Sequence, residues 1–518
     1  MRCSGFGCTL LTGMQPLLTA AETRAAEAAA ATRGLPASLL METAGTATAE
    51  AAVRLAGPES RFLVVCGPGN NGGDGFVAAR KLHAGGRRVD VWQVGTTGKS
   101  ASDAERNRQA LERTGVPIHA SAAALPLRQG DVVVDALFGT GLSRGPEGAA
   151  ADAIRNVLAW HASGVRVLAV DVPSGLSSDT GQAFDPCVAA DRTVSLGSMK
   201  LGLALEPGAT LAGAVEVVDI GLGEVQPPTW LLEETDGPRW LPLRRADSNK
   251  GSYGHLLVIA GGPGKTGAGA LAGLAALRTG VGLCTVAAPA DVLPDIQAHA
   301  SELMGVDLPA RLPLGLAHLE PLLAATAGKS ALVIGPGIPR GPETHLLLER
   351  LLARVDVPCL LDADALNAIA GHLAVLSEAR RPVVLTPHPG EMARLLGEGH
   401  TPAEVQSDRL GIARRFASRH KILLVLKGAR TLVATPDGTV RVNPTGNPGM
   451  ATGGTGDVLS GMVGALLAQG LPPDHAASVG VLAHGLAGDA AARRWGQLGL
   501  VASDLIAALG EVWTGWNR

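Results

Sequence analysis

Short apolar runs alternate with longer amphipathic stretches along most of the chain. In the first half the apolar runs predict strands at 62–66, 89–94, 132–137, 167–171, 193–196 and 215–220, with helices near 74–85, 103–114 and 149–162. An alanine-rich stretch at 20–55 predicts helix, broken near 34–36. Strands that alternate with helices favour a parallel sheet covered by helices on both faces. We therefore expect a doubly wound α/β domain at 14–225.

The same alternation returns in the second half, after a segment rich in proline and mixed charge that predicts a linker at 226–240. A second α/β domain is expected at 241–515. Its strands are predicted at 256–260, 284–287, 331–334, 359–361, 383–385, 422–426, 431–434 and 440–443, and its helices at 268–279, 342–353, 390–396, 405–418, 453–468 and 475–492. Residues 1–13 do not resemble the rest, so Met14 is an alternative start and neither domain is expected to include them.

Composition narrows the class of protein. Of 518 residues, 46% are hydrophobic and only 3% aromatic, so the core is aliphatic. A net charge of -3 argues against a nucleic-acid binder, which would carry a basic stripe. No apolar run reaches the roughly 18 residues of a membrane span. The six cysteines lack metal-site spacing, which favours reduced thiols and a cytoplasmic location.

The motif "NNGGDGF" at 70–76 directly follows the apolar strand predicted at 62–66. A glycine-rich loop between a strand and a helix exposes backbone N–H groups and the positive end of the helix dipole, which suits an anion. The motif lacks the Gly-Lys-Ser/Thr of a P-loop, and its glycine spacing differs from that of a dinucleotide fingerprint. Its unusual content is two asparagines and Asp74.

Two further loops follow predicted strands, "DALFGTGLSRG" and "AVDVPSGL". Because the carboxyl ends of parallel strands share one edge of a sheet, the polar residues of the three loops are expected to converge there. Such oxygen-rich groups suit a weakly held hard cation and a polar ligand. The alternative for each carboxylate is a helix cap or a turn. The converging residues are Asn70, Asn71, Asp74, Asp135, Asp171 and Ser174.

These three motifs resemble the N-terminal domain of the NAD(P)H-hydrate repair proteins, over about 14–225. The resemblance implies a Rossmann-like, three-layer fold and an epimerase that interconverts the R and S forms of NADHX and NADPHX. It implies potassium held by Asn71, Asp135 and Ser174. Asp171 is the candidate catalytic residue, because a carboxylate near the ring can stabilise a cation and move a proton. The implied substrate contacts are Asn70, Asn71, Gly72, Gly73, Asp74, Gly139, Thr140, Gly141, Leu142, Ser143, Arg144, Gly145 and Asp171.

The second half contains "NPTGNPGMATGGTGDVLSG", in which a run of glycines precedes Asp457 and an apolar helix. A glycine turn at a helix N-terminus stabilises a phosphate, and a carboxylate beside it can accept a hydroxyl proton during phosphoryl transfer. The alternative is an aspartate that only interacts with the helix dipole. Lys427 follows a buried strand, and His388 lies in the rigid loop "TPHPGEM", where a surface turn is the alternative interpretation.

The strings "KGSYGHLLVIAGG", "TPHPGEM", "LKG" and "GMATGGTGDVLSGM" resemble the ribokinase-like dehydratase domain of the same family, over about 240–515. The resemblance implies dehydration of S-NAD(P)HX to NAD(P)H with ADP as co-substrate, giving AMP and phosphate. The mechanism that we expect includes a bound Mg²⁺, with Asp457 as catalytic base; a homo-oligomer is also expected. The implied substrate contacts are Ala268, Gly337, His388 and Asp457, and the nucleotide contacts are Lys427, Gly428, Ala429, Arg430, Thr431 and Gly456.

Two alternatives remain open from the residues alone. The second half could be an ordinary small-molecule kinase, for a hydroxymethylpyrimidine or a sugar, because such kinases also use "GTGD". The first half could be a cofactor-binding regulatory module without turnover. Product analysis separates the first alternative from a dehydratase, and interconversion of the epimers separates the second from an epimerase.

Overall fold

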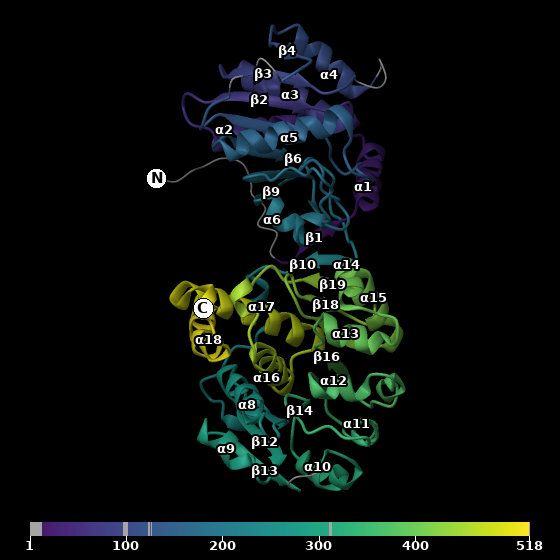
Figure 1. The fold of residues 1–518 in the computed structure, drawn as a ribbon, viewed down its shortest axis with the longest axis vertical. Helices are drawn as coiled ribbons and strands as arrows, with labels where there is room; N and C mark the ends of the chain where they lie inside the picture. Colours follow the sequence, from purple (N-terminus) through teal and green to yellow (C-terminus); the bar gives the residue numbers. More distant parts are fainter. Residues whose placement is uncertain (1–12, 97–101, 123–124, 126, 310–312, 517–518) are drawn as a thin grey trace. The chain divides into compact units, whose positions relative to one another are not determined.

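The computed structural model describes residues 13–96, 102–122, 125, 127–309 and 313–516. It divides into two compact units: Pro16–Thr229, here the N-terminal unit, and the chain from Trp230 onward with residues 13–15, here the C-terminal unit. Figure 1 follows both by colour, from purple to yellow. Of residues 1–13, which were expected to lie outside both domains, residues 1–12 are outside the described residues.

The N-terminal unit is built on a parallel sheet. Among the described residues it has seven strands in the order β4-β3-β2-β5-β6-β7-β9. The strands are β2 (Arg61–Cys66), β3 (Arg88–Gln93), β4 (Ile118–His119), β5 (Val132–Ala136), β6 (Arg166–Val170), β7 (Arg192–Leu196) and β9 (Ala214–Val218). The other elements are β1 (Gln15–Leu18), which pairs with β8 (Met199–Lys200), α1 (Ala20–Thr32), α2 (Ala37–Leu55), α3 (Asn70–Ala84), α4 (Asp103–Glu112), α5 (Gly148–Ala162), η1 (Leu201–Ala204) and α6 (Gly208–Leu211).

Helices cover both faces of this sheet. Successive side chains of a strand point to opposite faces. On β2, Phe62 and Val64 pack in a cluster with residues of α1, α2, α3 and α4, whereas Leu63 and Val65 pack with residues of α5. This arrangement confirms the doubly wound, three-layer α/β architecture predicted from the alternation of strands and helices.

The chain reverses direction across the sheet between β2 and β5. From β2 it continues outward through β3 and β4, and from β5 it continues the other way through β6, β7 and β9. Ligands of doubly wound sheets bind at the carboxyl ends of the strands beside such a reversal. Helix α3 begins at Asn70, four residues before the expected start, so the "NNGG" of the motif is a helical turn and not a loop. A Cβ on Gly72 would overlap the Gly67 carbonyl oxygen, so glycine lets the helix start directly against the strand end.

The C-terminal unit has a larger sheet. Its strand order among the described residues is β13-β12-β11-β14-β15-β16-β17-β18-β19-β10, parallel as far as β17 and antiparallel from β17 to β19. The strands are β10 (Thr229–Leu231), β11 (His255–Ile259), β12 (Leu283–Pro289), β13 (Met304–Leu308), β14 (Ala331–Ile334), β15 (Cys359–Leu361), β16 (Val383–Leu385), β17 (Leu423–Leu426), β18 (Leu432–Ala434) and β19 (Val440–Val442).

Short and long helices connect these strands. The helices are α7 (Asp236–Trp240), α8 (Thr266–Arg278), α9 (Leu293–Ala298), α10 (Leu319–Ala325), α11 (Thr344–Leu352), α12 (Asp364–Ile369), α13 (Pro389–Leu396), α14 (Pro402–Ser407), α15 (Arg409–His420), α16 (Thr455–Ala468), α17 (Pro473–Gly499) and α18 (Ala502–Trp516). Shorter 3₁₀ turns are η2 (Lys250–Tyr253), η3 (Leu316–His318), η4 (Leu373–Leu376) and η5 (Pro448–Met450).

Several elements differ from the sequence predictions. The segment expected to be a linker holds β10, which lies beside β19, and α7. The single helix expected at 405–418 is two helices, because Asp408 leaves the helical conformation at φ -137° and caps α15 by accepting the Gly411 N–H at 3.0 Å. The edge strand β13 and the last helix, α18, were not predicted.

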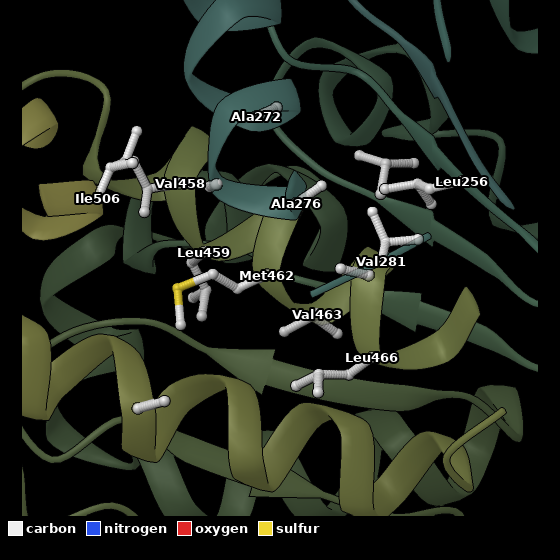
Figure 2. Close-up of a cluster of buried hydrophobic side chains, with 14 of the residues drawn as sticks. Leu256, Ala272, Ala276, Val281, Val458, Leu459, Met462, Val463, Leu466 and Ile506 are labelled. Carbon is white, nitrogen blue, oxygen red and sulfur yellow. The ribbon is translucent and has the colours of Figure 1, made fainter. Parts of the chain in front are cut away.

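Helices α8 and α16 pack closely in the core of the C-terminal unit. Their apolar residues, with Val281, Leu256 of β11 and Ile506 of α18, form the cluster in Figure 2. A Cβ on Gly461 of α16 would overlap the Ala272 carbonyl oxygen of α8, so only glycine allows this approach. Gly454, at φ 91°, turns the chain into α16 and fixes where its N-terminus lies. This packing places the first turn of α16, with Asp457, at the edge of the sheet.

The described cysteines Cys66, Cys187, Cys284 and Cys359 are free thiols. Burial raises the pKa of Cys284 and Cys359 to about 12, so neither supplies a thiolate near neutral pH. Within the described ranges, no helix combines the length and the apolar character that crossing a membrane requires.

Candidate active sites

The N-terminal unit has a cavity of about 530 Å³ beside the point where the chain reverses. It is lined by loops that follow β2, β5 and β6. Gly72 and Gly73 lie outside the lining; a Cβ on Gly73 would come within 2.6 Å of the Met41 Cε atom. Ser143, Arg144 and Gly145 also lie outside it. The sequence-predicted substrate residues that line the cavity are Asn70, Asn71, Asp74, Gly139, Thr140, Gly141, Leu142 and Asp171.

Asp171 is held rigidly at the end of β6. Its φ of 67° lies in the left-handed region, which is uncommon for a residue other than glycine. Its N–H donates to the Val194 carbonyl at 2.7 Å, and its carboxylate accepts the Leu196 N–H at 3.1 Å. Lys200, only 1% exposed, forms an ion pair with the same carboxylate. Sequence reasoning missed Lys200; its signal is one charged residue inside the apolar run "SLGSMKLGLAL".

Two more carboxyl groups face this cavity, Asp74 of α3 and Glu27 of α1. Burial, reinforced by the charges of Asp171 and Glu27, raises the pKa of Asp74 well above its ordinary value. Burial and the charge of Asp171 likewise raise the pKa of Glu27. Low dielectric and like charge both favour the neutral carboxyl form. The surroundings of Asp74 and Glu27 therefore favour the protonated form of both carboxyl groups.

The three residues of the expected potassium site are only partly brought together. Ser174 donates to Asp135 from its hydroxyl at 2.6 Å and from its backbone N–H at 2.8 Å. Burial raises the pKa of Asp135 to about 6, and these hydrogen bonds oppose the rise. Asn71 has a buried Nδ2 with no hydrogen-bond partner among the described residues, and its Oδ1 lies 3.1 Å from where a Cβ of Gly139 would be. The oxygen donors suit a hard cation in type.

In the C-terminal unit, Asp457 lies in the first turn of α16, directly after the glycine run. Burial and the charge of Asp362 raise the pKa of Asp457 to about 7, against the lowering effect of Lys427. A carboxylate with a pKa near neutrality is well matched to accept a proton in a reaction. The geometry therefore agrees with a general base beside an anion-binding helix N-terminus.

Lys427 lies at the centre of this cluster. Its Nζ is 2.8 Å from Asp362 Oδ1 and 3.7 Å from Glu391 Oε2. Burial lowers the pKa of Lys427, but the charges of Asp362 and Glu391 outweigh it and raise the pKa. A Cβ on Gly456 would come within 3.2 Å of the Lys427 Nζ, so the ammonium group lies beside the glycine turn. A fixed cation at such a turn can hold phosphate oxygens.

Arg409 of α15 fixes the predicted nucleotide loop, residues 427–431, through hydrogen bonds to its backbone carbonyl oxygens. The Arg409 guanidinium donates to the carbonyl oxygens of Leu426 and Lys427 at 3.2 and 3.3 Å, and to that of Ala429. Burial lowers the pKa of Arg409 to about 10. Gly428 has φ 136° and Arg430 has φ 57°, so the loop keeps an uncommon backbone conformation. Arg409 was not predicted from the sequence, because it lies 17 or more positions from its partners.

His388 caps α13: its Nδ1 accepts the Gly390 N–H at 3.0 Å, and its backbone N–H donates to Glu391 Oε2 at 2.9 Å. Burial lowers the pKa of His388, despite the opposing charge of Glu391. The histidine is half exposed. Its Nε2 lies 3.5 Å from Glu391 Oε1, so His388 caps the turn with both ring nitrogens in contact with α13.

Ala268 and Gly337 lie side by side: a Cβ on Gly337, whose φ is 69°, would come within 3.1 Å of the Ala268 Cβ. Lys265, one helical turn before Ala268, forms an ion pair with Asp364 at 2.8 Å. Arg340 pairs with the same carboxylate at 3.0 Å. Ala268 and Gly337 are thus joined to the Asp457 cluster through Asp364, whose charge raises the pKa of Asp457.

Asp362 and Asp364 were missed by sequence reasoning. Both follow directly after β15, in "LLDADALN", so the strand-end argument that found Asp135 and Asp171 would have found them. A cavity of about 1060 Å³ in the C-terminal unit does not belong to this site. It is lined by loops before β16 and β17, such as Pro382 and Ile422, at the opposite edge of the sheet from Lys427.

Comparisons with known proteins match both units. Residues 256–510 match the family model described as NAD(P)H-hydrate dehydratase, and residues 37–202 match that described as YjeF-related protein N-terminus. A protein of Moorella thermoacetica, a bifunctional NAD(P)H-hydrate repair enzyme, is 44% identical over 91% of each chain. The Escherichia coli protein of the same name is 37% identical over 89% of this chain and 86% of its own.

Among solved structures, the ADP/ATP-dependent NAD(P)H-hydrate dehydratase of Bacillus subtilis, co-crystallised with ATP/Mg²⁺, is 32% identical. It covers 55% of this chain and 98% of its own, with a TM-score of 0.47. The resemblance inferred from the motifs is confirmed by the curated relatives, because their similarity extends through both units. The chain belongs to the family of bifunctional NAD(P)H-hydrate repair enzymes.

Proposed function

We propose that the two units perform two steps of one repair reaction. The N-terminal unit interconverts the R and S forms of NADHX and NADPHX, and the C-terminal unit dehydrates the S form to NAD(P)H while ADP is converted to AMP and phosphate. The observation that carries the proposal is Asp457, a carboxyl group with a pKa of about 7 at the glycine-rich start of α16, beside the Lys427–Asp362 ion pair.

The dehydration needs a better leaving group than hydroxide. Asp457 accepts the proton of the ring hydroxyl, and the hydroxyl oxygen attacks the terminal phosphoryl group of the nucleotide. The N–H groups of the glycine turn and the Lys427 ammonium stabilise the negative charge that develops. Phosphate then leaves as the ring nitrogen donates its lone pair, and loss of a ring proton restores the dihydropyridine. These roles are supported by the position of Asp457 in the first turn of α16 and by the Lys427 Nζ, which lies beside the glycine turn.

The proposed nucleotide site, formed by residues 427–431 and the glycine turn before Asp457, suits Mg²⁺ that is bound to the nucleotide phosphates. Within the described residues, no group of three or more histidine, cysteine, aspartate and glutamate side chains could hold a metal by itself. Mg²⁺ usually keeps water and phosphate oxygens and takes only one or two carboxylates. Asp362 and Asp364 are the candidates, although both already pair with cations. When bound, the ion would neutralise phosphate charge.

For epimerisation, Asp171 is the proposed catalytic carboxylate, because it lines the cavity in a fixed conformation. Asn71, Asp135 and Ser174 are the proposed potassium ligands. The unpartnered Asn71 amide and the contact between Ser174 and Asp135 support this site. The unit order, an epimerase before a dehydratase on one chain, would let both epimers be repaired. A cytoplasmic, homo-oligomeric enzyme is part of the proposal.

The test is repair of mixed R- and S-NADHX by the full chain, with ADP or ATP as the only nucleotide and Mg²⁺ present. We expect NADH absorbance to return to the full amount of substrate, with AMP and phosphate as products from ADP. A stable phosphorylated product without NADH would instead favour the small-molecule kinase. Recovery of only the S fraction would contradict the epimerase and favour a non-catalytic first unit.

A further inference from the structure

Four carboxyl groups and two cationic groups line the cavity of the N-terminal unit: those of Glu27, Asp74, Asp103 and Asp171, and those of Arg24 and Lys200. Asp74, Asp171 and Lys200 are buried, whereas Arg24 and Glu27 are exposed. One buried cation therefore serves two buried carboxyl groups, and like charges at close range in a poorly solvated site disfavour ionisation of both. The contacts of each carboxyl group show which one is paired with the cation.

Asp171 is the carboxyl group whose charge the structure compensates with a cation. Lys200 forms an ion pair with Asp171 Oδ1, and the same oxygen accepts the Leu196 N–H at 3.1 Å. The Lys200 Nζ is itself fixed by the carbonyl oxygens of Leu196 at 2.6 Å and Ser198 at 3.2 Å. Because all three donors of the ammonium group are used, its position and that of Asp171 are set together.

Asp74 has the opposite surroundings. It is 9% exposed, it lines the cavity, and within the described residues its carboxyl group makes no hydrogen bond or ion pair with the protein. Its neighbours Asp171 and Glu27 carry like charge. A buried polar group without a protein partner is costly unless a ligand or water satisfies it. These surroundings suit a protonated Asp74 carboxyl group that donates a hydrogen bond to a ligand in the cavity.

We propose that Asp74 and Asp171 are a general acid and a general base that act together in epimerisation, and that Lys200 is the residue that positions Asp171. The proposal rests on the epimerase function proposed above and assigns its proton transfers. Two carboxyl groups with different environments are a recurrent way to supply an acid and a base at one pH.

The steps balance without any oxidant or reductant. With one epimer, Asp74 gives its proton to the ring hydroxyl as the carbon–oxygen bond breaks, water leaves, and the nitrogen lone pair forms a carbon–nitrogen double bond. Water then adds to the other face of that carbon while Asp171 accepts its proton, and the electron pair returns to nitrogen. The enzyme is left with Asp74 ionised and Asp171 protonated, the state that converts the other epimer back. Proton exchange with solvent restores the first state.

Other charged and titratable groups face this pair from the surrounding elements. Cys66, behind Asp74 on β2, is buried, and burial together with the charge of Asp74 raises the pKa of its thiol well above the ordinary value. Lys200 is the buried cation of the lining and pairs with Asp171, so Asp74 lies among acids without a paired cation of its own, which favours its neutral form. The charged groups of the cavity lining are Arg24, Glu27, Asp74, Asp103, Asp171 and Lys200.

The first test uses Asp74→Asn in the full chain, because asparagine has the shape of the neutral carboxyl group but cannot release a proton. We expect kcat for R-to-S conversion to fall by about 10²–10⁴-fold, with KM little changed. Incorporation of heavy oxygen from labelled water into recovered hydrate should fall equally. Asp74→Glu should recover part of the rate. If the wild type epimerises and Asp74→Asn does so at the same rate, the acid role is wrong; if the wild type does not epimerise, the proposed function itself fails.

The second test uses Lys200→Met and Lys200→Arg, with the dehydration of pure S-hydrate on the same chain as the control for nucleotide and assay. Removal of the cation beside Asp171 should move the low-pH limb of the epimerisation profile to higher pH, because the base is then easier to protonate. Lys200→Arg keeps the charge and should keep the limb closer to its original place. A uniform loss of rate in Lys200→Met with an unchanged profile and a lowered Tm would show that Lys200 only stabilises the fold, and would overturn its positioning role.

Discussion

The Lys427 ammonium group lies 2.8 Å from Asp362 Oδ1, and the two side chains are 18% and 1% exposed. The other oxygen of Asp362 accepts the Ser460 hydroxyl of α16 at 2.7 Å. One carboxylate therefore fixes both the cation and the helix that carries Asp457. The ends of β15 and β17 and the first turns of α16 are tied together at the place where the phosphate of a nucleotide would bind.

This relationship predicts a strong effect of Lys427→Met. Removal of one partner leaves the Asp362 carboxylate buried without its cation, which typically costs about 3–5 kcal/mol. We expect a lower Tm and weaker nucleotide binding by calorimetry, whereas Lys427→Arg should retain most of the stability. Unchanged nucleotide affinity in a folded Lys427→Met protein would remove Lys427 from the phosphate site.

Asp457→Asn should abolish dehydration while nucleotide binding stays nearly normal. The substitution removes the proton acceptor but keeps the glycine turn and Lys427. Loss of a general base typically lowers the rate about 10²–10⁴-fold. The measurement is NADH formation from pure S-NADHX, with epimerisation by the same protein as the control. Near-normal turnover would exclude Asp457 as the base.

The pH dependence of dehydration should follow Asp457. Its pKa is raised from 3.8 to about 7, so the base is protonated below pH 7 and the rate should rise through about 7 to a plateau. The contribution of Asp457 to folding stability changes with pH in the opposite direction to the rate. Because the folded pKa exceeds the unfolded one, this group stabilises the fold fully below about pH 4, and that contribution is lost as pH rises through about 7. A dehydration rate that stays flat from about pH 5 to about pH 8 would contradict the assignment of Asp457 as the general base.

Asp135→Ala should weaken the proposed potassium site and slow epimerisation. The substitution removes the carboxylate that Ser174 contacts at 2.6 Å. R-hydrate consumption, measured in potassium and then in a large organic cation, should lose most of its ion response. Dehydration of pure S-hydrate should not change, because Asp135 and Asp457 lie in different units. Normal epimerisation with the wild-type ion response would rule out Asp135 as a ligand.

Gly461→Ala should destabilise the C-terminal unit. The new Cβ would overlap the Ala272 carbonyl oxygen between α16 and α8, and overpacking of this kind typically costs about 1–3 kcal/mol. Gly510→Ala in α18 is the matched control, because no atom lies within 4 Å of its Cβ position and alanine favours helix. Thermal unfolding should show a lower Tm for the first variant and an equal or higher one for the second. Equal Tm values for both would show that the helices separate at no cost.

Much of this protein is determined by local sequence. Apolar runs such as 62–66 and 256–260 are short and are followed by glycine-rich turns, which favours strands buried on both faces, and their alternation with helices determined the α/β class. The strand-end motif located Asp171 because the carboxyl ends of parallel strands meet at one edge, and the glycine run before a helix located Asp457 because such a turn suits a phosphate. Elements with a weak pattern were not predicted: β13 is largely exposed and has no apolar run that would indicate a strand.

The partners of the site residues were decided by tertiary structure. Lys200 reaches Asp171 across 29 positions and Lys427 reaches Asp362 across 65, and no local pattern encodes such pairs. The raised pKa values of Asp74 and Asp457 likewise depend on burial and on charges that arrive from other elements. The sequence by itself determined which side chains end the strands; only the folded sheet, by removing water and bringing distant charges within a few ångströms, decided which carboxyl groups pair with a cation and which have raised pKa values.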